Sequence, residues 1–164
     1  MEPIPEAIVE KTWQEVAGFS PKKAKKELMK ISNSQPDLLA FVTESSEEMG
    51  QEVRELAIFM FVVIYRMFQQ AYGRIKKISS EEVFECYQHN KVLMERLEGA
   101  DETFVDRIVS VQTSKQLYVV NYVVDALMEE DEGEDALIFT EEEKGSLFLI
   151  LKTVIGVLDQ KGIG

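Results

Sequence analysis

Residues 56 to 65 read LAIFMFVVIY, an unbroken apolar run inside a longer stretch with helical spacing. A helix that crosses a membrane needs about 20 apolar residues, so this run is too short to span a bilayer. A helix on the surface of a globular protein keeps a polar face, which this run lacks. The segment therefore predicts a central helix that other helices surround.

The predicted central helix extends over about residues 47–73, and Ser45 or Ser46 is the expected N-cap. Polar residues share one side of this helix at both of its ends. In the middle, Phe59 and Val62 interrupt that polar stripe. We therefore expect the centre of the helix to be covered on all sides.

Start signals for other helices recur along the chain. Ser79 and Glu82 form a capping box, as do Thr140 and Glu143, and Ser20 precedes a proline that suits a first helical turn. Few segments alternate apolar and polar residues as a half-buried strand does. The pattern predicts an all-α fold, a single domain over residues 1–164 with about seven helices around the buried central helix.

Two segments are ambiguous. Residues 117–128 contain VVNYVV, which has strand propensity, but the surrounding residues keep helical spacing and favour a helix. Thr113 and Gln116 form a further capping-box pattern inside an apolar helical stretch. Residues 113–116 are therefore predicted to break or redirect the helix.

Charge and length limit the class of protein. The chain has 164 residues, the size of one domain, and a formal net charge of −12. Such a charge repels phosphate backbones and anionic membrane surfaces, so we expect neither nucleic-acid binding nor membrane binding. The lone cysteine and the lack of a signal-peptide pattern at the N-terminus favour a cytoplasmic location.

The acidic excess concentrates in residues 129–143, which contain nine Asp or Glu. The segment does not match an EF-hand, because Gly133 at the sixth position would place Met128 first and Phe139 twelfth. It is either a solubilising loop or a docking patch for a basic partner. Five lysines between residues 22 and 30 form either a solvated helical face or a contact for an anion or an acidic loop of another copy.

Residues with metal or nucleophilic chemistry are scarce. The chain has one cysteine, Cys86, and one histidine, His89, and helical spacing points the two side chains in different directions. A structural zinc site needs four ligands, so we expect no metal and no cofactor. No glycine-rich phosphate loop or serine elbow is present, and no catalytic residue stands out. Asn90, on an otherwise apolar stripe, is expected to be buried and structural.

The candidate binding residues are Tyr118, Asn121, Tyr122 and Asp125, which share one side of a helix at spacing i, i+3, i+4, i+7. Tyrosine is enriched at interfaces and ligand pockets because its ring is apolar and its hydroxyl forms hydrogen bonds. The alternative is a boundary layer between core and solvent.

These observations leave three functional hypotheses. The first is a non-catalytic protein that binds another protein or its own copy. The second is a small-molecule-binding or sensor domain whose pocket is lined by Tyr118, Tyr122, Phe59 and Tyr65. The third is a carboxylate-based enzyme. A cavity on the order of a few hundred Å³ beside the central helix favours a ligand, whereas a broad exposed apolar patch favours a protein partner.

Overall fold

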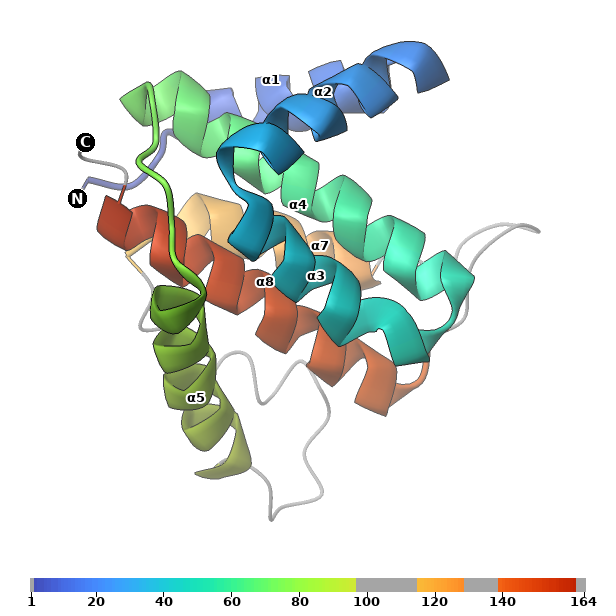
Figure 1. Cartoon of the computed structure of the whole chain (residues 1–164), viewed down its shortest axis with the longest axis vertical. Coiled ribbons are helices and arrows are strands. Elements are labelled where there is room, and N and C mark those ends of the chain that lie inside the picture. Colours follow the sequence, from blue (N-terminus) through green and yellow to red (C-terminus); the bar gives the residue numbers. More distant parts are fainter. Residues whose placement is uncertain (1, 97–114, 129–138, 162–164) are drawn as a thin grey trace.

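The computed structural model describes residues 2–96, 115–128 and 139–161, and helices account for 85% of these residues. The described part contains seven α-helices, one short 3-10 helix and no strand, which confirms the all-α prediction (Figure 1). The elements are α1 (Glu6–Ala17), α2 (Pro21–Ser34), α3 (Pro36–Ser46), η1 (Glu47–Met49), α4 (Gln51–Tyr72), α5 (Ser80–Arg96), α7 (Leu117–Met128) and α8 (Glu141–Lys161).

The predicted start signals act as helix caps. The backbone N–H of Glu82 donates to Ser79 Oγ over 3.2 Å, while the N–H of Ser79 donates back to the Glu82 carboxylate over 3.3 Å. Thr140 and Glu143 make the same reciprocal pair over 3.0 and 3.1 Å. Each box satisfies two backbone donors that the first helical turn leaves free, so α5 and α8 begin where the sequence predicts.

Helix α4 is the centre of the bundle. It packs against α8, α1 and α3, while α5 crosses α8 and α7 packs on both α8 and α1 (Figure 1). The fully buried side chains come mostly from α4 and α8, and they include Met60, Phe61, Ile64, Met67, Phe68, Leu147 and Leu151. Among the described residues, no helix has both the length and the apolar character needed to cross a membrane.

The predicted N-terminus of the central helix is wrong by about four residues. Ser46 ends α3 instead of capping α4, because its hydroxyl donates backwards to the Val42 carbonyl over 2.7 Å. A turn of 3-10 helix follows, and Gly50 then adopts a φ of 95°. A side chain would strain this backbone conformation, so glycine allows the change of direction from which α4 starts at Gln51.

The centre of α4 is also less enclosed than predicted. Val62 is buried as expected, but the phenyl ring of Phe59 is 38% exposed. The reason is tertiary, because α1 and α7 flank this side of α4 without closing over Phe59.

The ambiguous segments are resolved in part. Residues 117–128 form α7, so the helical prediction for VVNYVV is confirmed. Of the predicted break, residues 113 and 114 lie outside the described ranges, whereas Lys115 and Gln116 are non-helical. Most of the acidic segment, residues 129–138, also lies outside them, and its last acids form the first turn of α8.

Candidate functional site

Helices α1 and α7 begin beside each other and run in the same direction. The N–H of Ile4, just before α1, donates to the side-chain oxygen of Gln116, just before α7, over 2.9 Å. The amide nitrogen of the buried Gln116 side chain donates to Tyr72 over 3.2 Å and to Asp159 over 2.7 Å. These bonds hold the starts of α1 and α7 side by side.

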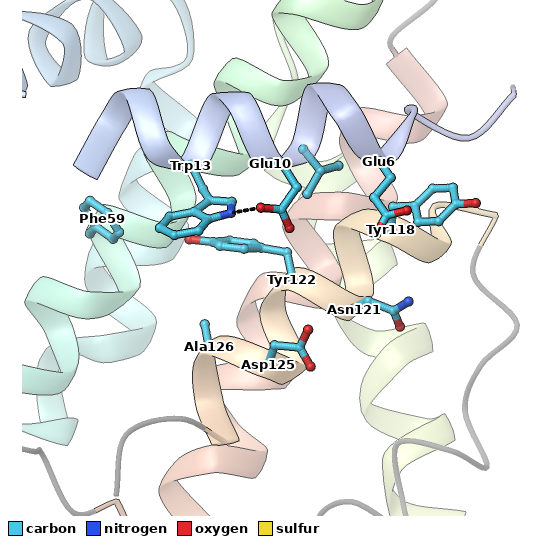
Figure 2. Close-up of a pocket in the computed structure, with 10 residues that line it drawn as sticks. Glu6, Glu10, Trp13, Phe59, Tyr118, Asn121, Tyr122, Asp125 and Ala126 are labelled. Carbon is cyan, nitrogen blue, oxygen red and sulfur yellow. Dashed lines mark hydrogen bonds between the residues drawn. The ribbon is translucent and has the colours of Figure 1, made fainter. Parts of the chain in front are cut away.

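A groove of about 400 Å³ lies between α1 and α7 and reaches the exposed Phe59 of α4 (Figure 2). Its walls contain all four residues that the sequence analysis proposes as binding candidates. The lining residues are Glu6, Val9, Glu10, Trp13, Phe59, Tyr118, Asn121, Tyr122, Asp125 and Ala126. The stripe on α7 is therefore one wall of a groove and not only a boundary layer.

Aromatic side chains from three helices meet at this groove. Figure 2 shows Trp13 of α1 extending towards Tyr122 of α7, with Phe59 of α4 beyond Trp13. The indole N–H of Trp13 donates to the Glu10 carboxylate over 3.1 Å, which holds the indole ring against α1. Tyr122 is partly buried against the core, and this burial raises the pKa of its phenol.

One residue predicted for the pocket does not reach it. Tyr65 is only 2% exposed and packs near Phe61 in the core, with ring centroids 6.1 Å apart. On a helix, Tyr65 lies about 120° away from Phe59, because six residues turn the chain by about 600°. The groove therefore takes its aromatic rings from α1 and α7 and only Phe59 from α4.

The groove is acidic, with three carboxylates among its lining residues. Within the described ranges, no lysine or arginine pairs with Glu6, Glu10 or Asp125. The ion pairs of the described part form elsewhere, for example between Lys161 and Glu82 over 3.0 Å, and Arg66 with two glutamates of α1 and α2. Glu6, Glu10 and Asp125 thus give the described walls of the groove a negative charge.

The wall contributed by α1 was not predicted from the sequence. Glu6, Glu10 and Trp13 have the spacing i, i+4, i+7, so they do share one helical face. Trp13, however, also belongs to the apolar stripe of α1 that packs against the core. This face of α1 can be recognised in the sequence as an acidic and aromatic stripe. No pattern within α1, however, indicates that the stripe lies opposite α7.

The polar group around Asn90 joins α5 to α8. Asn90 is buried and donates to Thr153 Oγ1 over 3.3 Å, while its carbonyl accepts from Lys152 Nζ over 2.9 Å. Burial raises the pKa of the half-buried Cys86 thiol and lowers that of Lys152. His89 is exposed, and no set of three or more potential metal ligands is present in the part of the chain described. Asn90 is therefore a structural residue between two helices.

Comparison with protein-family models, with curated proteins and with solved structures finds no match. The groove between α1 and α7 is therefore the feature from which a function is inferred. It combines a defined volume, exposed aromatic rings and carboxylates without a cation among the described residues.

Proposed function

We propose that this chain is a non-catalytic binding protein that recognises another protein through the groove between α1 and α7. The observation that supports this proposal is the convergence of Trp13, Tyr118, Tyr122 and Phe59 on one groove. Tryptophan and tyrosine supply a large share of the binding energy at protein interfaces, because they bury much area and lose little conformational freedom. Two of the four are well exposed, Phe59 at 38% and Tyr118 at 37%.

A small-molecule site is the second candidate, and the size of the groove favours it. Its volume of about 400 Å³ lies within the range of ligand pockets, roughly 300–1,000 Å³. The groove also reaches the central helix at Phe59, and a cavity of this size beside that helix is the feature that favours a ligand. The carboxylate-based enzyme has no comparable support, since no feature of the groove singles out a catalytic pair.

The test compares partner capture by the native protein and by matched surface variants. The double variant Phe59→Ala/Tyr118→Ala removes two exposed rings from the groove. Phe84→Ala, 61% exposed on α5, removes an exposed ring elsewhere. We expect the native protein and Phe84→Ala to bind the same partner protein, and the double variant to bind none of it. The double variant should still melt cooperatively, which would show that it is folded.

Equal retention by all three proteins, or no retained protein, would contradict the proposal. Native mass spectrometry of the purified protein distinguishes a small-molecule site from a protein-binding site. A compound of small mass that stays bound to the native chain, and is absent from the double variant, would assign the groove to a small ligand instead.

A further inference from the structure

Pairs of an acid and a tyrosine repeat along the groove. Glu6 and Glu10 lie four residues apart on α1, as Tyr118 and Tyr122 do on α7, and the hydrogen bond between Ile4 and Gln116 places the starts of the two helices side by side. Figure 2 shows Glu6 beside the Tyr118 end of the groove and Glu10 beside the Tyr122 end. Successive pairs are four residues apart on each helix, which is a rise of about 6 Å.

Each pair has the chemistry that binds an organic cation. A carboxylate forms charge-assisted hydrogen bonds with an ammonium or guanidinium group, and the face of an aromatic ring attracts the same charge. Neither Glu6 nor Glu10 pairs with a lysine or arginine in the part of the chain described, and Asp125 adds a further negative charge. The net charge of −12 also draws a basic molecule towards the protein.

The spacing indicates what carries the cations. In an extended peptide, alternate side chains point to the same face and lie about 6.6 Å apart, close to the rise between the two pairs. Beyond the second pair the groove reaches Phe59, whose partly exposed ring offers an apolar surface to a bound side chain. A simple diamine supplies two charges but has no apolar group for Phe59, whereas a peptide supplies both.

We infer that the groove binds an extended basic segment of a partner protein. Two lysine or arginine side chains separated by one residue bind at the Glu6–Tyr118 and Glu10–Tyr122 pairs, and an apolar side chain covers Phe59. This inference rests on the proposed function, since it names the ligand of the same groove.

The fluorescence of Trp13 reports on binding in the groove, because Trp13 is the only tryptophan of the chain and it lines the groove. The probes are capped peptides of sequence KSKSL and its reverse LSKSK, titrated against the native protein. The peptide KKSSL has the same composition and charge with adjacent lysines, and QSQSL is neutral. We expect either KSKSL or LSKSK to change Trp13 fluorescence saturably and to bind at least fivefold more tightly than KKSSL. We expect QSQSL to cause no change.

Matched variants locate the bound peptide. Glu6→Gln and Glu10→Gln should each weaken binding about two- to fivefold, the effect of losing one exposed ion pair. Tyr118→Leu should weaken it similarly, because leucine keeps an apolar surface but has no π face. Glu85→Gln, on the exposed surface of α5, changes the net charge by the same amount and should leave the affinity unchanged.

Four results would overturn the inference. Equal affinity for KKSSL, or an equal loss in Glu85→Gln, would show only general attraction to an acidic protein. Putrescine that displaces the peptide at comparable concentration would assign the groove to a small diamine. If no peptide changes the fluorescence while the groove-dependent capture succeeds, the basic ligand is rejected and the protein-binding function stands.

Discussion

Ile64 and Phe59 lie five residues apart on α4 and experience opposite environments. Five residues turn a helix by about 500°, so the two side chains point about 140° apart. Ile64 is fully buried, whereas Phe59 is 38% exposed at the groove. The stability cost of truncating an apolar side chain depends on this difference and not on its hydrophobicity alone.

Ile64→Ala should lower the free energy of unfolding by about 2–5 kcal/mol, because the surrounding core cannot collapse into the cavity. Glu52→Ala, on the exposed surface near the start of the same helix, should change it by less than about 0.5 kcal/mol. Urea denaturation of both variants gives the comparison. A neutral Ile64→Ala would contradict the buried position of this residue.

Phe59→Ala and Phe61→Ala form a matched pair, because both remove a phenyl ring from the same helix. Phe61 is fully buried, so its truncation should cost about 3–5 kcal/mol. Truncation of Phe59 should cost less than half as much, because part of its ring already contacts water. Equal losses in urea denaturation would show that the groove is closed over Phe59 in solution.

At the scale of the helix, the close approach of α5 and α8 depends on a residue without a side chain. A Cβ atom added at Gly156 of α8 would lie 2.8 Å from the Sγ of Cys86 on α5, too short for a normal contact. The Cys86 thiol also donates to the Thr153 carbonyl over 3.7 Å and accepts from Asn90 Nδ2 over 3.6 Å, so a shift of its sulfur would disturb both contacts. The two residues are therefore expected to be energetically coupled.

Gly156→Ala should be destabilising, because overpacking costs about 1–3 kcal/mol and exceeds the gain of about 0.5–1 kcal/mol from alanine in a helix. In the Cys86→Ala background, the same substitution should cost much less, since the sulfur that it meets is gone. Thermal or urea unfolding of the full double-mutant cycle measures this coupling.

Gly145→Ala is the control on the same helix. Nothing lies within 4 Å of a Cβ at Gly145, so alanine there should stabilise the protein by up to about 1 kcal/mol. If Gly156→Ala were as stabilising as Gly145→Ala, α5 and α8 would be farther apart in solution than the structure places them.

At the scale of the whole molecule, Gln116 connects elements that are distant in sequence. Its buried amide bonds to Ile4 near the N-terminus, to Tyr72 at the end of α4 and to Asp159 in α8. Figure 1 shows the segment before α1 and the end of α8 on the same side of the bundle. A single side chain thus helps to close the bundle and to hold the starts of α1 and α7 side by side.

Gln116→Leu should lower the free energy of unfolding by about 1–3 kcal/mol, because it leaves the buried N–H of Ile4 without its acceptor. The amide of Ile4 should also exchange its hydrogen faster in the native state. Gln160→Leu, at an exposed position of α8, is the matched substitution and should leave both measurements unchanged. If the hydrogen exchange of the Ile4 amide were unaltered in Gln116→Leu, the hydrogen bond between Ile4 and Gln116 would be contradicted.

Most of the helices, the capping boxes of α5 and α8 and one wall of the groove were predictable from the sequence, whereas the start of α4 was not. Capping boxes such as Ser79 with Glu82 act within one turn, and a helical face such as Tyr118 with Tyr122 follows from a spacing of four residues. These features depend on neighbours along the chain, so composition and spacing determine them. The apolar run of residues 56–65 likewise determines that its helix is central, because so much apolar surface must leave water.

Only the tertiary structure decided which faces meet. The second wall of the groove depends on the bond between Ile4 and Gln116, whose separation of 112 residues no local pattern encodes. The exposure of Phe59 depends on how closely α1 and α7 approach each other over α4. Helical periodicity determines the direction in which a side chain points, but the packing of the other helices determines whether it meets protein or water.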